Sequence, residues 1–185
     1  MSVELHDEQI LLRAPRPTDA TPLCEAALES VGDVSRWLPW CHAAYTHADA
    51  EAWISACMLA WQREESYPFF IFDSAGRQLL GGCALNEIDR PRLRANLGYW
   101  IRSSRARCGL ATAAARLVAR FALETLAMQR VEIVAAVDNL ASQRVATKLG
   151  AVCEGLLRNR LRIRDMAFDA YGYSLIPADI GHWKR

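Results

Sequence analysis

The amino-acid sequence predicts a single α/β domain in which helices cover a mixed sheet in three layers. The chain has 185 residues, of which 52% are hydrophobic and 23% are charged, and this length and composition are typical of one globular domain with one core. Its patterns follow the order strand, helix, helix, three strands, helix, strand, helix, two strands. Strand–helix–strand crossovers give parallel neighbours and hairpins give antiparallel ones, so this order predicts a mixed sheet. We therefore assign residues 1–185 to one domain.

The N-terminal part of the chain is predicted to form one strand and two helices. Residues 9–13 form the strand, and a proline-containing turn follows it. Thr18 and Asp19 are good N-cap residues, which predicts a helix from there to about Gly32. Residues 46–49 resemble a capping box and precede apolar side chains at helical spacing, which predicts a second helix to about residue 65.

The rest of the chain begins with a hairpin and then alternates strands with helices. Turn residues 74–77 separate the two strands of the hairpin, and Gly150 closes the last helix. The final two strands are expected to pair in antiparallel fashion. The predicted strands are 67–73, 78–87, 97–101, 131–137, 152–162 and 168–176, and the predicted helices are 110–125 and 140–149.

Charge, hydropathy and cysteine usage exclude several classes of protein. The formal net charge is +1, so no overall field attracts a polyanion and we expect no nucleic-acid partner. No apolar run approaches the roughly 20 residues of a membrane span, and the N-terminal residues lack a signal-peptide pattern, so we expect a cytoplasmic protein. The six cysteines are scattered without a C-x-x-C pair, so we expect neither disulfides nor a bound metal.

A short loop between a strand and a helix is a candidate for anion binding. In such a loop the backbone N–H groups and the helix dipole converge on one point. Gly109 allows close approach of a ligand, and neighbouring arginines add positive charge. An ordinary strand-to-helix turn has the same features, so this loop alone leaves both interpretations open. The residues of the loop are Arg107, Cys108, Gly109, Leu110, Ala111 and Thr112.

Four short motifs together resemble one enzyme superfamily. They are Gly98-Tyr99-Trp100-Ile101, Gly109-x-Ala111-Thr112, Asp138-Asn139-x-x-Ser142 and Lys148-x-Gly150. Their order and spacing are similar to those of the GNAT N-acetyltransferases, and closest to the branch that acetylates the N-termini of ribosomal proteins, the RimJ/RimL type. The resemblance covers nearly the whole chain. It implies an acyl-CoA-dependent enzyme that moves an acetyl group from acetyl-CoA to a primary amine by direct attack in a ternary complex.

The resemblance also implies a fold and a cofactor site. The central sheet would be mostly antiparallel, with helices on both faces and one splayed pair of parallel strands, residues 97–101 and 131–137. The pantetheine arm of acetyl-CoA would lie between these strands, and its pyrophosphate would lie on the amides of residues 107–112. The residues implied to bind the arm are Trp100, Ile101 and Arg102 through their backbone, Asn139 near the thioester, and Ser142 near the sulfur.

One position departs from the superfamily pattern. The residue three before the central glycine is usually glutamine or arginine, and here it is Ala106. Arg105 or Arg107 would have to replace that side chain. Backbone amides supply most of the phosphate contacts, so we expect the site to persist.

The resemblance assigns the general acid more clearly than the base. Ser142 matches a serine near the CoA sulfur and is the candidate proton donor to the departing thiolate, although a serine in the first turn of a helix is also common. Leu161 stands where similar enzymes carry a glutamate, and leucine cannot accept a proton. Glu87 and Glu154 remain as candidate bases, and each is equally typical of a solvated surface carboxylate.

The acceptor is expected to be a protein α-amine, because a site with a weak base favours an amine that is partly neutral. Trp37 and Trp40 are candidates for one wall of the acceptor cleft, or for a packing plug. Arg158, Arg160 and Arg162 would share one face of a strand, which would either attract an acidic ribosomal protein N-terminus or form a solvated face. Acetylation of a small-molecule amine and non-catalytic binding of acyl-CoA are the alternatives, and the sequence leaves open whether two chains form a homodimer.

Overall fold

The computed structural model describes residues 3–181 and residue 183, which form one eight-stranded sheet with its helices. The strands lie in the order β1-β2-β3-β4-β5-β6-β8-β7. Neighbouring strands are antiparallel except β5 and β6, which are parallel because a helical crossover connects them. The mixed, mostly antiparallel sheet is therefore confirmed. The strands are β1 (Glu4–His6), β2 (Ile10–Arg13), β3 (Tyr67–Asp73), β4 (Leu79–Asp89), β5 (Arg94–Ile101), β6 (Arg130–Ala136), β7 (Val152–Ile163) and β8 (Met166–Leu175).

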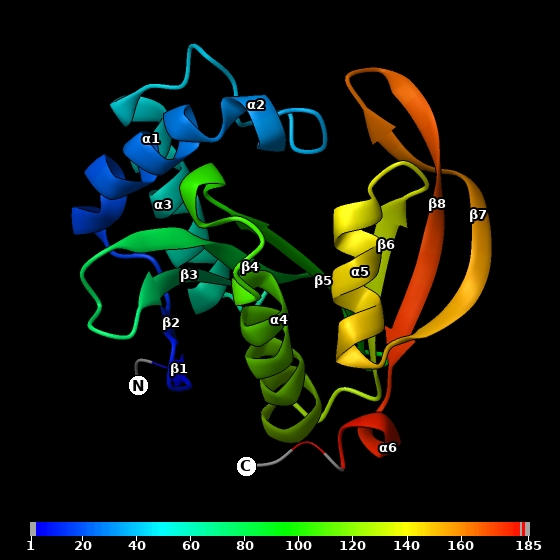
Figure 1. Cartoon of the computed structure of the whole chain (residues 1–185). Coiled ribbons are helices and arrows are strands. Elements are labelled where there is room, and N and C mark those ends of the chain that lie inside the picture. The colour runs from blue at the N-terminus through cyan, green and yellow to red at the C-terminus, as the bar shows by residue number, and fades with distance from the viewer. Residues whose placement is uncertain (1–2, 182, 184–185) are drawn as a thin grey trace.

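The α-helices lie on both faces of this sheet and at its lower end in Figure 1. Three further short helical turns are Pro17–Asp19, Ser103–Arg105 and Phe121–Thr125. Within the described residues, no helix is long and apolar enough to cross a membrane, and no cluster of three or more His, Cys, Asp or Glu residues could hold a metal ion. The α-helices are α1 (Ala20–Glu29), α2 (Val31–Val34), α3 (His47–Gln62), α4 (Leu110–Arg120), α5 (Leu140–Leu149) and α6 (Pro177–Ile180).

Several elements differ from the sequence prediction, among them β1, β5 and the first helix. The sequence pattern does not predict β1, and β5 begins at Arg94 instead of residue 97. The first helix, expected to continue to Gly32, ends at Glu29. Ser30 follows it, and its hydroxyl donates to the carbonyl of Ala26 at 2.6 Å. A serine side chain that bonds to the preceding turn competes with the helical backbone, and the chain restarts as the short α2.

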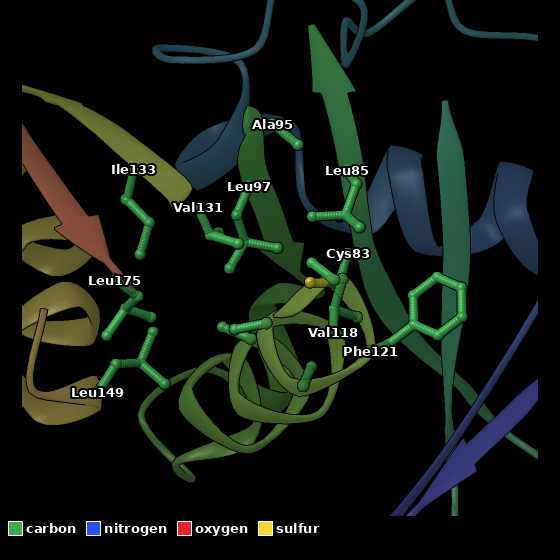
Figure 2. Close-up of a cluster of buried hydrophobic side chains, with 14 of the residues drawn as sticks. Cys83, Leu85, Ala95, Leu97, Val118, Phe121, Val131, Ile133, Leu149 and Leu175 are labelled. Atoms are coloured by element: carbon green, nitrogen blue, oxygen red, sulfur yellow. The ribbon is translucent and has the colours of Figure 1, made fainter. Parts of the chain in front are cut away.

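Alternate side chains of the sheet enter two hydrophobic cores on opposite faces. Phe69 belongs to the core beneath α4 and α5, whereas its neighbour Phe70 belongs to the core between the sheet and helices α1 and α3. Figure 2 shows Leu97 of β5 and Val131 of β6 directed toward α4, beside Val118 of that helix. The helices therefore hold both faces of the sheet, which confirms the predicted three layers.

Strands β5 and β6 are paired only where each begins. Their parallel register runs from Arg94 opposite Arg130 to Asn96 opposite Glu132, and within the described residues it ends there. Beyond that point β5 pairs with β4 alone and β6 pairs with β8 alone. The strands diverge toward their C-terminal ends, which lead into α4 and α5 (Figure 1). The splayed parallel pair implied by the resemblance is confirmed.

Candidate active site

One edge of β5 is open where it diverges from β6. The backbone N–H of Arg102 donates to the carbonyl of Leu80 at 2.8 Å, on the side of β4. Successive residues of a strand direct their backbone groups to opposite sides, so Trp100 also faces β4, whereas Tyr99 and Ile101 face the opening. Of the three backbone partners implied for the pantetheine arm, Ile101 fits. Trp100 and Arg102 direct these groups to β4 instead, and motif spacing does not reveal this alternation.

Helix α4 begins with backbone N–H groups that no side chain caps. Its N-cap is Gly109, and the N–H of Ala113 donates to the Gly109 carbonyl at 3.0 Å. The N–H groups of residues 110–112 therefore lack an intrahelical acceptor, and the helix dipole adds partial positive charge there. Arg107 and Gly109 both have positive φ, 63° and 81°, a backbone that turns successive N–H groups toward one side. This arrangement suits an anion.

Arg107 is the arginine that remains available to compensate for Ala106. The guanidinium of Arg105 donates to the side-chain oxygen of Gln78, the residue before β4, at 2.7 Å. Arg107 is exposed, and none of the described residues forms an ion pair with it. The sequence offered both Arg105 and Arg107 as replacements for the side chain missing at Ala106. The contact with Gln78 engages Arg105 and leaves Arg107 as the candidate.

A hollow lies beside the start of α4. Its cavity volume is ≈ 320 Å³. Cys108 and Gly109 line it next to the uncapped N–H groups, and Arg116 and Lys148 bring positive charge from α4 and α5. An uncapped helix start and two basic side chains thus border one space that has room for a phosphorylated ligand.

Residues at the start of α5 are held together and contact β5. The carboxamide oxygen of Asn139 accepts the N–H of Ser142 at 3.1 Å and caps the helix. The Tyr99 hydroxyl lies 3.0 Å from Ser142 Oγ and 3.1 Å from the Ser142 carbonyl oxygen. Burial raises the pKa of Tyr99 above its usual value, so this hydroxyl keeps its proton at neutral pH. Asn139, Ser142 and Tyr99 therefore meet at the open end of the two strands.

Comparison with known proteins identifies the family of this chain. A family model described as acetyltransferase (GNAT) domain matches residues 9–152. The chain belongs to the GNAT acetyltransferase family. It is 29% identical over 178 residues to "Putative ribosomal N-acetyltransferase YdaF" of Bacillus subtilis (strain 168), covering 94% of each chain. It is 24% identical over 169 residues to the ribosomal-protein-serine acetyltransferase of Escherichia coli (strain K12), covering 91% of this chain and 93% of the relative.

A solved structure shares the fold of this acetyltransferase. The coenzyme A complex of RimL, a ribosomal L7/L12 alpha-N-protein acetyltransferase, superposes with a TM-score of 0.86 at 20% sequence identity. The superposition covers 94% of this chain and 98% of RimL. Taken with the family match and the named relatives, the GNAT fold and an N-acetyltransferase activity are established for the chain.

The acetyltransferase has two carboxylates that the sequence offered as bases, and Glu154 is unsuited to that role. Its carboxylate is paired with Arg130 and accepts a hydrogen bond from Ser174 Oγ at 2.7 Å. The hydrogen bonds from Arg130 and then Ser174 lower the pKa of Glu154 to about 2. A carboxylate held in this way is a poor proton acceptor near neutral pH.

Glu87 lies at an irregular point of β4. The register between β4 and β5 shifts between Asn86 and Asp89, and Glu87 has a positive φ of 48°. This bulge turns the side chain outward, and its carboxylate lies 3.5 Å from the guanidinium of Arg160 on β7. Glu87 is therefore an exposed carboxylate with one cationic neighbour.

The two tryptophans of the segment after α2 have different surroundings. Trp40 packs edge-on against Trp100 of β5, with ring centroids 5.3 Å apart. Gly82 of β4 gives the Trp100 indole its space, because a Cβ at that position would lie 2.7 Å from the indole nitrogen. Trp37 is half-buried, with the guanidinium of Arg36 4.6 Å from its ring centroid. Trp40 thus connects this segment to the strand that borders the opening.

The tip of the β7–β8 hairpin meets the same segment. Arg164 donates to the carbonyl of Ser35 at 2.9 Å, and Arg36 lies 3.7 Å from the carboxylate of Asp138, just before α5. Figure 1 shows the hairpin tip beside the loop that follows α2. These contacts bring three distant parts of the chain together around the open end of β5 and β6.

The β7 segment that carries Arg158, Arg160 and Arg162 contains an irregularity in its pairing with β8. The register with β8 shifts between Leu157 and Leu161, which places two extra residues in β7, and regular alternation of side chains is lost there. Arg160 and Arg162 are ion-paired with carboxylates. Arg158, Arg160 and Arg162 therefore do not form a row of three unpaired cations on a regular strand.

Proposed function

We propose that this GNAT enzyme transfers an acetyl group from acetyl-CoA to the α-amine of a protein N-terminus. The observation that carries the proposal is the divergence of β5 and β6 after Asn96 and Glu132. It leaves the backbone edge of Ile101 open to the amides of a pantetheine arm. The uncapped start of α4 lies at the same end and suits the pyrophosphate. The shared fold with the coenzyme A complex of RimL supports this use of the opening.

The reaction is a direct attack by the neutral amine on the thioester carbonyl. A C–N bond forms and the C–S bond breaks, while the nitrogen loses a proton and the sulfur gains one. Ser142 Oγ is the proposed proton donor to the sulfur, and the Tyr99 hydroxyl at 3.0 Å holds that oxygen in place. Asn139 contributes by capping α5 and fixing the position of Ser142. Its carboxamide nitrogen is the group left to donate to the arm.

The weakness of the candidate bases favours an α-amine over a lysine as the acceptor. Glu154 is held by Arg130, Glu87 is exposed beside Arg160, and Leu161 cannot accept a proton. An α-amino group with a pKa of roughly 7.7 to 8.0 is about a fifth to a third neutral near pH 7.4. A lysine with a pKa of about 10.4 is only about a thousandth neutral. An α-amine therefore needs less help from the enzyme.

The names of relatives that refer to ribosomal proteins support the proposal of a protein acceptor, and we place this reaction in the cytoplasm. The segment holding Trp37 and Trp40 and the tip of the β7–β8 hairpin are proposed to border the acceptor site, since both lie at the open end of the two strands. Acidic residues after the acceptor's N-terminus would face the arginines of the hairpin, of which Arg158 has no ion-pair partner among the described residues.

A mass-spectrometric screen of acetyl transfer tests the proposal. Three acceptor sets are incubated with the enzyme and acetyl-CoA: peptides with free N-termini, lysine peptides with blocked N-termini, and polyamines. We expect acetylation of the first set, with preference for acidic residues near the N-terminus. Preferential acetylation of blocked lysine peptides or of polyamines would contradict the acceptor assignment. Binding of acetyl-CoA without transfer to any set would favour a non-catalytic domain.

A further inference from the structure

The hollow beside α4 contains two cations that the pyrophosphate assignment does not use. Arg116 comes from α4 and Lys148 from α5, so two separate helices direct basic side chains to one space. Ion pairs join most arginines of the described chain to carboxylates, but none of these pairs includes Arg116 or Lys148. Both charges remain available to an anionic ligand.

The position of Arg116 on α4 relates it to the uncapped helix start. Gly109, Thr112 and Arg116 line the hollow from one side of the helix, as expected for 3.6 residues per turn. The helix rises about 10 Å between Gly109 and Arg116. Side chains on a helix lean toward its N-terminus, so the long arginine side chain reaches back along the hollow. One ligand with two separated anionic groups could contact both places.

The surroundings of Arg116 orient it without using its hydrogen-bond donors. Its guanidinium carbon lies 5.4 Å from the ring centroid of Trp183, a contact with the π face. Asp7 also lines the hollow, but its Oδ1 accepts the backbone N–H groups of Gln9 and Ile10 at 2.8 and 2.9 Å. The one carboxylate at the hollow is thus engaged in a local turn, and the two cations leave the hollow with net positive charge.

We propose that Arg116 and Lys148 bind the 3′-phosphate of coenzyme A and make the enzyme select CoA over dephospho-CoA. This inference rests on the proposed use of acetyl-CoA. If the arm lies between β5 and β6 and the pyrophosphate lies at the start of α4, the adenosine end must continue outward, beyond that helix start. Its 3′-phosphate is a second, separate dianion. Arginine binds phosphate with two parallel hydrogen bonds, and lysine adds a point charge.

Isothermal titration calorimetry with CoA and with dephospho-CoA tests this assignment. We expect the wild-type enzyme to bind CoA about tenfold more tightly than dephospho-CoA. In the R116Q/K148Q variant the ratio should fall to about twofold or less, with little change in the affinity for dephospho-CoA. R144Q is the matched control, because Arg144 is an exposed arginine on α5 that does not line the hollow. It should keep the wild-type ratio.

The outcomes separate this inference from the proposed function. Equal wild-type affinities for the two ligands, or an unchanged ratio in R116Q/K148Q, would overturn the 3′-phosphate assignment and leave the proposed function intact. Failure of both CoA and dephospho-CoA to bind the wild-type enzyme would contradict the proposed function itself. Because Arg116 contacts Trp183, K148Q is also measured alone, and thermal denaturation verifies that each variant is folded. K148Q alone should reduce the ratio by part of the full effect.

Discussion

Replacing Gly109 by alanine separates backbone strain from loss of the cofactor site. Gly109 has φ = 81°, and a Cβ built there meets no heavy atom within 4 Å. The substitution therefore creates no clash, and its cost to folding is the left-handed backbone of a non-glycine residue, about 1 kcal/mol. For a domain of this size, that destabilisation should lower the melting temperature by about 2–4 °C.

The effect on acetyl-CoA binding should be larger than the effect on stability. The new methyl group would project into the open space at the start of α4, where the pyrophosphate is proposed to lie. Loss of one charge-assisted hydrogen bond costs about 1.5–3 kcal/mol, which corresponds to about tenfold or more in Kd. Calorimetry with acetyl-CoA measures this change. A bulky residue at the same position should abolish binding.

Gly150 provides a matched control for the cost of placing a non-glycine residue in a left-handed backbone. It also has a left-handed conformation, φ = 78°, and a Cβ there meets no heavy atom within 4 Å. It ends α5 instead of starting α4. Gly150→Ala should lose similar stability and keep most of its affinity for acetyl-CoA. Wild-type affinity in Gly109→Ala would refute the pyrophosphate assignment, and equal losses of affinity in both variants would attribute the effect to strain.

Two further predictions concern the proposed acid and the ion pair between Arg130 and Glu154. Ser142→Ala should lower kcat about 100-fold with little change in acetyl-CoA affinity, and Tyr99→Phe, which removes only the hydroxyl next to Ser142, should lower kcat less and add little to Ser142→Ala. Steady-state kinetics of the single and double variants check both, and additive losses would exclude a shared role. Glu154→Gln should flatten the loss of stability in acid, because the wild-type pKa of about 2 lies below its usual 4.5. The ionised carboxylate stabilises the fold above pH 4.5, and this contribution disappears as pH falls through about 2. Denaturant titrations from pH 7 to 2 measure it, and parallel curves for the two proteins would contradict it.

Local sequence patterns determined most elements of this fold. The predicted strand 67–73 and helix 140–149 have the observed bounds, and the capping box before α3 forms between Thr46 and Asp49. Strand periodicity and helix caps depend on near neighbours in the chain, so they can be read without the tertiary structure. The positions of Gly109 and Ser142 at the starts of two helices were likewise predicted from motif order.

Contacts between distant residues decided how the site is arranged. The sequence did not reveal that β5 directs Ile101 to the opening, that Tyr99 contacts Ser142, or that Arg130 holds Glu154. Each of these depends on strand register or on residues more than 20 positions apart. The two extra residues between Leu157 and Leu161 of β7 became visible only in its register with β8, for the same reason. Composition and periodicity thus determined which elements form, whereas pairing between strands decided which backbone edges and charges remain free to bind a ligand.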